Sequence, residues 1–263
     1  MPVRLVECRQ AVSPSRLPGL DWAVNPYRGC SHACAYCYAQ DVTRFETGRP
    51  WGAVVEAKTN IVSRLKSDLS KGSKGVYGIG TVTDPYQPAE KEYELTRGCL
   101  SVLKRYGARI SILTKSDLVL RDLDILSGWR GAEVGITVST MDDRVCGVIE
   151  PGAPSAETRV GALRKLVGSG VDVYLMAAPI IPGVSDSGDS LGRLVEAARD
   201  AGVRRIMWDM YNPKPLADAR LRASLGNLGV GPEVLRAEKV QQGVREVLSD
   251  QCGSSGIKLV DAF

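Results

Sequence analysis

The stretch "GCSHACAYCYAQ", residues 29–40, places three cysteines within eight residues and includes His32, the only histidine of the chain. Cys30, Cys34 and Cys37 follow the spacing C-x3-C-x2-C. A closed zinc site takes four ligands, usually as two separated pairs, and a second cysteine pair does not follow in this sequence. His32 lies inside the triplet, where sharing one ion with both flanking cysteines would strain so short a loop. A disulfide would leave one of the three thiols over.

The same triplet fits a [4Fe–4S] cluster better than zinc. Each iron of such a cluster is held by one cysteine sulfur, so three cysteines leave one iron without a protein ligand. That open iron can bind a small molecule. We therefore predict that Cys30, Cys34 and Cys37 ligate a [4Fe–4S] cluster.

The composition is that of a water-soluble globular protein of 263 residues with a formal net charge of +4. No apolar run reaches the ~18 residues of a membrane span, and no signal-peptide pattern opens the sequence. The seven cysteines are an odd number, and in a reducing compartment thiol chemistry or metal binding is expected rather than disulfides. We expect a cytoplasmic protein. The modest charge neither demands nor excludes a nucleic-acid partner.

Short apolar runs alternate with amphipathic stretches along most of the chain, a pattern typical of βα units around a parallel sheet. The runs are nearly continuous in apolar residues, as strands buried on both faces are. A first strand is expected near residues 21–27. The further predicted strands are 75–82, 109–114, 133–140, 171–181 and 204–211.

Six strand–helix units fall short of a full eightfold barrel, so the predicted fold is an α/β partial (β/α)6 barrel with a C-terminal helical extension. We expect an N-terminal extension over 1–20 and the barrel over 21–212, with an insertion at about 45–74 in which "AVVEAK" adds a strand. Residues 213–263 are expected to form a helical appendage, with a helix over 233–250. Active-site residues of such folds follow the carboxyl ends of the strands.

Several stretches in order resemble the radical S-adenosylmethionine (SAM) superfamily, and within it the spore photoproduct lyase-like group. The resemblance implies a radical SAM barrel whose open iron binds SAM. It also implies that one electron from the cluster cleaves SAM to a 5′-deoxyadenosyl radical, which removes hydrogen from the substrate. The stretches are "NPYRGCSHACAYCYA" (25–39), "GTVTDPYQPAEKEYELTR" (80–97), "ISILTKSDLVLRDLDIL" (110–126), "VGITVSTMDD" (134–143), "EPGAPSAETRVGALRKL" (150–166) and "APIIPGVSD" (178–186).

Polar residues after three predicted strands are candidates for SAM binding. Asp84, with Thr83 beside it, lies where these proteins place the acidic segment that receives the SAM amino group; an ordinary Asp-Pro turn is the alternative. Lys115 carries an ammonium suited to the SAM carboxylate. Ser139 can bond the carboxylate or the ribose. Ordinary polarity at the mouth of a barrel would explain each of these residues equally well.

Aromatic and apolar residues complete the predicted cofactor site. Tyr38 is expected to shield the cluster or line the adenine pocket, and Tyr36 matches a family tyrosine implied to act in hydrogen transfer. Packing over the cysteine loop is the alternative for both. Ile180 and Ile181 are the candidates for packing on adenine. His32 can donate to a cluster sulfide, although a solvent-facing loop histidine is the more frequent outcome.

Two isolated cysteines are candidates for the chemistry on the substrate. Cys146 follows the fourth strand, and Cys252 lies on an expected Gly/Ser tether that would fold over the barrel mouth. Either is a candidate hydrogen-atom donor, sulfur source or ligand to a second cluster, and inert burial is the alternative. In "MWDMYNP" (207–213), Trp208, Asp209, Tyr211 and Asn212 alternate about the end of the sixth strand, and we expect some of them to meet the substrate. Core packing explains Trp208 equally well.

The predicted substrate is a small nucleoside or nucleotide, rearranged at sugar or base or given sulfur in natural-product biosynthesis by a lyase- or transferase-type reaction. DNA photoproduct repair is an alternative, but the chain has no basic run for a duplex. A non-catalytic iron–sulfur electron carrier or sensor is the rival of another class, and it leaves Asp84, Lys115 and Ser139 at strand ends unexplained. An electron donor such as flavodoxin or ferredoxin is implied as a partner.

Overall fold

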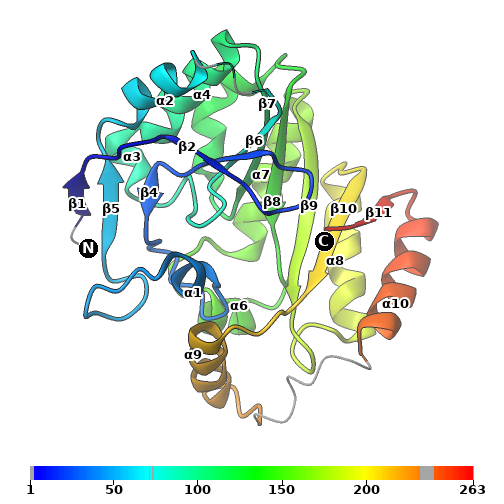
Figure 1. Ribbon diagram of the computed structural model, residues 1–263. Helices are drawn as coiled ribbons and strands as arrows, with labels where there is room; N and C mark the ends of the chain where they lie inside the picture. The colour runs from blue at the N-terminus through cyan, green and yellow to red at the C-terminus, as the bar shows by residue number, and fades with distance from the viewer. Residues whose placement is uncertain (1–2, 71, 73, 232–239, 263) are drawn as a thin grey trace.

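The computed structural model describes residues 3–70, 72, 74–231 and 240–262. Its centre is an eight-stranded sheet in the order β11-β10-β9-β8-β7-β6-β3-β2 (Figure 1). All neighbours in it pair parallel except β2 and β3, which are antiparallel. Its strands are β2 (Val12–Pro14), β3 (Trp22–Val24), β6 (Val76–Ile79), β7 (Arg109–Thr114), β8 (Ala132–Thr137), β9 (Asp172–Ile180), β10 (Arg205–Met210) and β11 (Lys258–Asp261).

The six consecutive parallel strands from β3 to β10 confirm the predicted partial (β/α)6 barrel. Five of the predicted runs match β6 to β10, with β8 beginning one residue before its run, because each is an apolar segment that the sheet buries. The run expected near 21–27 divides instead. Its first part forms β3, and Tyr27–Arg28 form β4 of a second sheet.

That second sheet has three strands in the order β1-β5-β4. β1 covers Val3–Val6, and β5 covers Val55–Lys58, within the "AVVEAK" stretch expected as an extra strand. β5 pairs parallel with β1 and antiparallel with β4. The N-terminal segment is therefore tied to the insertion, and β4 leads directly into the cysteine loop.

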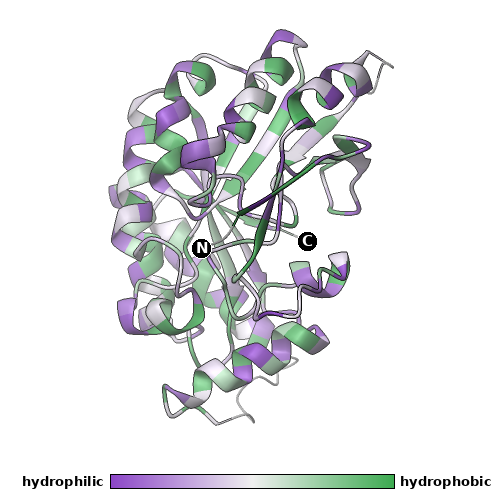
Figure 2. Cartoon of the chain, turned by 90° about the vertical axis from the view of Figure 1, so that its left-hand side faces the viewer, coloured by the Kyte–Doolittle hydropathy of each residue, from purple (hydrophilic) through white to green (hydrophobic). Residues whose placement is uncertain are grey.

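Helices form the outer layer of the molecule. Figure 2 shows polar residues on their outer sides and apolar residues gathered on the strands between them. No helix of the described residues is long and apolar enough to cross a membrane. The helices are α1 (Ala39–Thr43), α2 (Ile61–Leu69), α3 (Glu90–Tyr93), α4 (Leu95–Arg105), α5 (Leu123–Leu126), α6 (Asp143–Ile149), α7 (Ala156–Gly168), α8 (Gly188–Asp200), α9 (Pro215–Gly226) and α10 (Val240–Ser254), with the 3-10 helix η1 (Asp117–Asp122).

The C-terminal part is helical, as expected, but it also returns a strand to the sheet. Of the helix expected over 233–250, residues 233–239 lie outside the described residues, and the rest belongs to α10. β11 then pairs parallel with β10, which the sequence reading missed. Cys252 lies in α10 with its thiol in the core, so the expected Gly/Ser tether is wrong.

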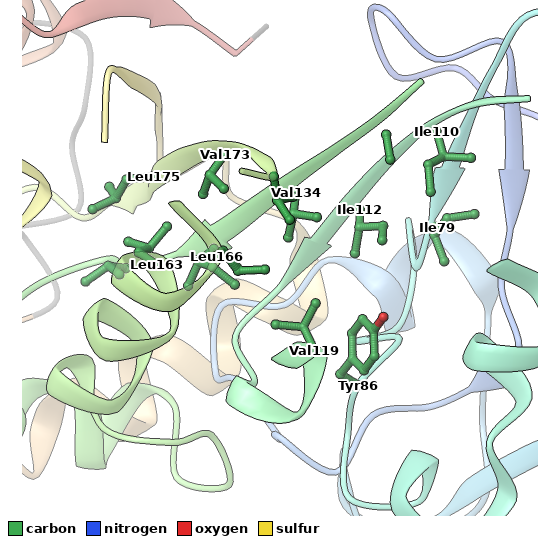
Figure 3. Close-up of a cluster of buried hydrophobic side chains, with 14 of the residues drawn as sticks. Ile79, Tyr86, Ile110, Ile112, Val119, Val134, Leu163, Leu166, Val173 and Leu175 are labelled. Carbon is green, nitrogen blue, oxygen red and sulfur yellow. The ribbon is translucent and has the colours of Figure 1, made fainter. Parts of the chain in front are cut away.

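The main core lies between the sheet and the helices that cover it. In Figure 3, Ile112 and Val134 from adjacent strands point toward Val119 of η1 and Leu166 of α7. All four side chains are buried. Burial of this kind is the dominant favourable term in folding, and here it fixes the strand ends from which the cavity is built.

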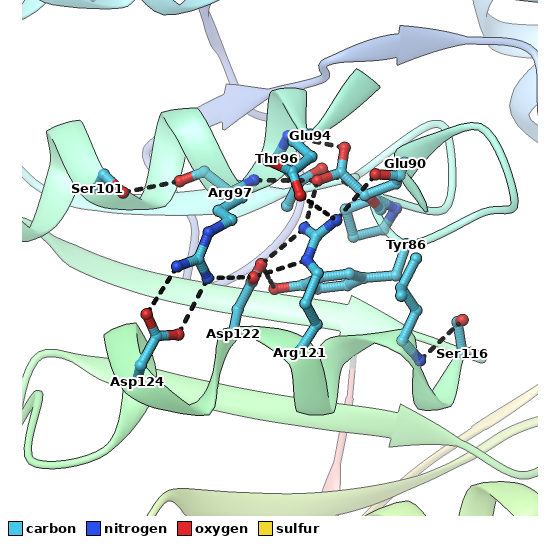
Figure 4. Close-up of polar contacts among 12 residues, drawn as sticks. Tyr86, Glu90, Glu94, Thr96, Arg97, Ser101, Ser116, Arg121, Asp122 and Asp124 are labelled. Atoms are coloured by element: carbon cyan, nitrogen blue, oxygen red, sulfur yellow. Dashed lines mark hydrogen bonds and ion pairs between the residues drawn. The ribbon is translucent and has the colours of Figure 1, made fainter. Parts of the chain in front are cut away.

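Two arginines bracket buried carboxylates beside this core (Figure 4). Arg121 pairs with Glu90 at 2.7 Å, and Arg97 pairs with Asp122 at 2.7 Å. Tyr86 donates to Asp122 at 3.0 Å. These contacts join η1 to α3 and α4, and through Tyr86 they fix the polar segment that follows β6.

Candidate functional site

A cavity of about 390 Å³ lies against the parallel strands and reaches their carboxyl ends. Its wall comes from β6 to β10, from the cysteine loop, and from residues 17–20 and 262 near the two ends of the chain. The wall includes His32, Asp209, Tyr211 and Asn212, and eight of the residues predicted to hold the cluster, bind SAM or transfer hydrogen also line it. These eight are Cys30, Cys34, Tyr36, Cys37, Tyr38, Thr83, Asp84 and Lys115.

The three clustered cysteines are free thiols that line the cavity. Burial raises the pKa of each of them, to about 12 for Cys34, and the negative charges of neighbouring thiolates add to the effect for Cys30. Within the described ranges, no three His, Cys, Asp or Glu side chains surround one point as a single metal ion requires. Three sulfurs spread around a cavity suit a cluster in which each binds a different iron, so the donor set fits [4Fe–4S].

Residues after β6 hold the beginning of the cysteine loop. The Gln87 side chain accepts from the backbone N–H of Ser31 at 2.9 Å and donates to the carbonyl of Gly29 at 3.2 Å. Thr83 donates its hydroxyl to the same carbonyl at 2.6 Å. Thr83 therefore supports the loop, and its hydroxyl hydrogen is already used.

The segment after α6 holds the middle of the loop through backbone contacts. The N–H of Ala35 donates to the backbone carbonyl of Ile149 at 2.8 Å, and the N–H of Gly152 donates to the backbone carbonyl of His32 at 3.0 Å. A Cβ at Gly152 would lie 2.2 Å from the Ser31 carbonyl oxygen, far inside contact distance. Only glycine allows the two backbones to approach in this way.

Helix α9 holds the end of the loop. Arg220 donates to the Cys37 carbonyl at 2.6 Å, and its guanidinium lies 5.6 Å from the centre of the Trp51 ring. Asp41 of α1 accepts from the backbone N–H of Leu216 at 2.8 Å, at the beginning of α9. A carboxylate at that position satisfies a free amide and complements the helix dipole.

Asp84 is buried in the cavity wall with both carboxylate oxygens engaged. The Nδ1 atom of His32 lies 3.2 Å away, the Thr114 hydroxyl donates at 2.6 Å and the Lys115 N–H at 2.8 Å. Burial alone would raise the pKa of Asp84, but His32 and these donors hold it at about 2. His32, buried rather than facing solvent, therefore lies between Asp84 and the cysteine loop.

Glu150 connects four side chains in the interior next to the cavity. It forms an ion pair with Arg159 at 2.5 Å, and it accepts from the hydroxyls of Tyr36 and, at 3.1 Å, Ser139. The Nζ atom of Lys115 lies 4.0 Å from it. Burial would raise the pKa of Glu150, but Lys115 and Arg159 hold it below its usual range. The carboxylate is therefore ionised and ties the cysteine loop to the ends of β7 and β8.

Both predicted tyrosines turn their hydroxyls to protein acceptors. Tyr36 donates to Glu150, and Tyr38, 37% exposed, donates to the Thr81 carbonyl at 2.6 Å. Lys115 lies over the Tyr36 ring at 5.3 Å. The rings line the cavity, while hydrogen transfer through the Tyr36 hydroxyl would require its bond to Glu150 to open; that role stays a prediction.

Five predicted residues are not brought to the cavity wall. Ile180 and Ile181 are fully buried. The Ile181 N–H donates to the Ser185 hydroxyl, and the Ile180 carbonyl accepts from the backbone N–H of Tyr211. Ser139 reaches the site only through Glu150. Cys146 in α6 and Cys252 in α10 are buried in the main core. Their proposed chemistry stays a prediction to be tested.

Sequence reasoning missed the residues that hold the site together. Gln87, Glu150 and Arg159 lie within stretches used for the family resemblance, but their spacing carries no signal that they meet. Arg220 lies beyond the region of resemblance. Each acts through a contact between segments distant in the chain, which periodicity and local motifs cannot report.

Sequence comparisons place the chain among related proteins. It is 37% identical over 181 residues to the uncharacterized protein MJ0683 of Methanocaldococcus jannaschii, covering 69% of this chain and 68% of the relative. It is 34% identical over 193 residues to the uncharacterized protein Mb2609c of Mycobacterium bovis, where it covers 70% of this chain and 57% of that protein. The chain thus spans little more than half the length of the mycobacterial relative.

Structure comparisons agree on the fold. A complex of spore photoproduct lyase with dinucleoside spore photoproduct superposes with a TM-score of 0.73 at 15% identity, covering 99% of this chain and 82% of the lyase. Streptococcus suis SuiB bound to S-adenosylmethionine superposes with a TM-score of 0.58 at 13% identity, covering 91% of this chain and 49% of that protein.

The model of the radical SAM superfamily matches residues 24–195, from β3 and the cysteine loop through most of α8. This range contains the three clustered cysteines, the strand ends that precede Asp84 and Lys115, and the end of α6 that precedes Glu150. The chain belongs to the radical SAM superfamily, whose enzymes use a [4Fe–4S] cluster and S-adenosylmethionine.

Proposed function

We propose that the chain is a radical SAM enzyme that removes a hydrogen atom from a nucleoside-type small substrate. Cys30, Cys34 and Cys37 each bind one iron of the cluster, and SAM occupies the adjacent end of the cavity. The bound cluster and SAM supply a 5′-deoxyadenosyl radical after one-electron reduction. The observation that carries the proposal is that these three thiols and the Lys115 ammonium line one cavity.

Lys115 is the residue we assign to the SAM carboxylate. Burial lowers its pKa, but the neighbouring Cys34 and Glu150 outweigh that effect and raise it, so the ammonium stays charged. Lys115 and Arg159 carry two positive charges against one on Glu150, which leaves one positive charge for a carboxylate. Asp84 lies on the side we assign to the SAM amino group, where its charge attracts an ammonium although its oxygens are engaged.

A nucleoside-type substrate is the class we favour, in a lyase- or transferase-type step of natural-product biosynthesis. The dinucleoside bound by the similar spore photoproduct lyase supports this class. DNA photoproduct repair shares the nucleoside recognition. A peptide, as in the SuiB complex with its precursor peptide SuiA, is the competing class. Flavodoxin or ferredoxin is the reductant we propose.

The test begins with anaerobic reconstitution of the full chain with iron and sulfide. We expect absorbance near ~400 nm and, after dithionite reduction, 5′-deoxyadenosine from SAM. The Cys34→Ala variant should lose both signals, whereas Cys99→Ala, which removes a thiol buried in the core, should keep both. Added nucleosides should raise 5′-deoxyadenosine formation above the substrate-free rate. A wild-type protein that binds iron but forms no 5′-deoxyadenosine would refute the enzyme assignment.

A further inference from the structure

Asp209 is a wall residue that the chemistry described so far does not use. It lies near the end of β10, where the pairing with β9 shifts register between Trp208 and Met210. Such irregularities re-aim side chains and occur often beside active sites. Asp209 lines the cavity together with Met207 and Asn212. It therefore faces the space left for the substrate beyond the cysteine loop.

The carboxylate of Asp209 differs from the other two in the wall. Asp84 is engaged by His32 and two further donors, and Glu133 pairs with Arg205 at 2.8 Å. Among the described residues, no side chain donates to Asp209 or forms an ion pair with it, and its one donor is the neighbouring Met210 backbone N–H. Burial raises its pKa, as expected for a carboxylate in a mainly apolar wall.

The cavity wall is also poor in positive charge. In the described part of the chain, Lys115 is its only lysine and no arginine lines it. Lys115 lies next to Glu150 at the cysteine end. Arg245 borders a small hollow beside Asp209, but its guanidinium pairs with Asp261 at 3.0 Å. A phosphate near Asp209 would meet a negative charge without a matching cation.

From this arrangement we infer that Asp209 recognises an exocyclic amine of the substrate's nucleobase, and that the substrate is a nucleoside without phosphate. The inference rests on the proposed function and makes its substrate class more specific. A half-buried carboxylate whose one protein donor is a backbone N–H keeps acceptor positions open toward the cavity, which favours a ligand that brings a donor. Asp and Glu accept from the N4 amine of cytosine, whereas a carbonyl at the same position repels a carboxylate.

Three probes test the amine and the absence of phosphate separately. They are cytidine, uridine and cytidine 5′-monophosphate. Their binding is measured by calorimetry on the anaerobically reconstituted holoenzyme with SAM and without reductant, so that no turnover occurs. We expect cytidine to bind about tenfold more tightly than uridine, the ratio that corresponds to about 1.4 kcal/mol. The monophosphate should bind no more tightly than cytidine.

The Asp209→Asn variant tests the residue itself, because an amide can donate to a carbonyl as well as accept from an amine. The preference for cytidine should disappear or invert in favour of uridine. Asp172→Asn is the matched control, since Asp172 is an exposed carboxylate outside the cavity wall, and it should keep the wild-type preference. Iron content and thermal unfolding establish that each variant is folded.

Each unexpected result contradicts a different part of the inference or of the proposed function. Nucleosides that bind without preference for the amine, or a preference that survives in folded Asp209→Asn, overturn the role of Asp209 and leave the proposed function intact. Tighter binding of the monophosphate overturns the phosphate-free substrate. If none of the three probes binds while SAM does, the nucleoside class itself fails. The wild-type comparison alone can overturn the inference, even if the variant does not fold.

Discussion

At the scale of single residues, one buried carboxylate connects the side chains around the site. Glu150 forms an ion pair with Arg159 and accepts hydrogen bonds from Tyr36 and Ser139. The Lys115 ammonium lies 4.0 Å from it. Removing one member of a buried ion pair leaves the other charge uncompensated, which costs more than the pair contributes. The stability of the protein and the geometry of the cysteine loop therefore depend on the same side chain.

We expect Glu150→Ala to lower the free energy of unfolding by about 3–5 kcal/mol because it strands the buried Arg159 guanidinium. Urea denaturation followed by circular dichroism measures the loss. Combining Glu150→Gln with Arg159→Met removes both charges and should cost less than Glu150→Ala. Glu196→Gln, an exposed carboxylate on α8, should stay within about 0.5 kcal/mol of wild type. Equal stability of Glu150→Ala and wild type would show that the pair is not stabilising.

The two isolated cysteines give a second prediction. Burial raises the pKa of Cys146 to about 12 and of Cys252 to about 11, so both remain protonated at pH 8. Because the thiolate is the nucleophile, iodoacetamide should leave both unmodified in the folded protein and modify both in urea. Peptide mass spectrometry reports each site separately. Rapid modification in the folded state would mean that these thiols become accessible and would favour the catalytic roles predicted from the sequence.

At the same scale, the residues predicted from the sequence are those whose function is carried by type and local spacing. Asp84 and Lys115 reach the cavity because they follow β6 and β7 of the parallel sheet, and the cysteine triplet reaches it from β4 of the second sheet. Ile180 and Ile181 do not line the cavity, and their packing on adenine stays a prediction. Apolar residues after a strand serve the cavity and the core equally well by sequence, and here they belong to the core.

At the scale of elements, the turn between α6 and α7 supports the cysteine loop. The Ile149 carbonyl accepts from Ala35, which lies between the second and third cysteines. The Gly152 N–H donates to the carbonyl of His32, which lies between the first and second. The contact at Gly152 tolerates no side chain. A change at this glycine therefore acts on the loop directly, although residue 152 is no predicted ligand.

Gly152→Ala should destabilise the protein by about 1–3 kcal/mol, because its Cβ would meet the Ser31 carbonyl oxygen at 2.2 Å. It should also speed the removal of iron by a chelator from the reconstituted protein. Gly161→Ala is the matched control in the middle of α7, where a Cβ has open space. Helix propensity predicts a gain of about 0.5–1 kcal/mol there and unchanged iron release. Identical iron release from both variants would contradict the supporting role of the turn.

Elements with long apolar runs were predictable, and those defined by pairing partners were not. β7, β8 and β9 are buried on the sheet and read directly from the sequence. β11 has only partly buried and exposed residues, and a four-residue strand at an edge leaves little periodicity. The short β4 likewise exists because β5 pairs with it.

At the scale of the whole molecule, the chain ends both contribute to the cavity. Residues 17–20 line it from the N-terminal side, and Ala262 lines it immediately after β11. Asp261 fixes that strand end by accepting from the Trp208 indole N–H at 2.8 Å. The expected helical appendage is therefore also a part of the sheet and of the cavity wall.

Asp261→Ala should lower the free energy of unfolding by about 1–3 kcal/mol, since the buried Trp208 indole loses a charged acceptor. Arg245→Met removes the exposed cation paired with the same carboxylate and should change stability by less than about 0.5 kcal/mol. Thermal and urea unfolding compare the two. A larger loss for Arg245→Met would assign the stabilisation to the ion pair instead.

The contacts that hold the cysteine loop also determine when, during synthesis of the chain, the loop can reach its final structure. The loop lies near residue 30, yet it is held by Gln87, by the turn at 149–152 and by Arg220. During translation the last of these residues leaves the ribosome well after the cysteines, and contacts between distant segments form late in folding. Iron–sulfur delivery therefore has a finished binding loop to act on only once synthesis has passed Arg220, 183 residues after the last of the three cysteines.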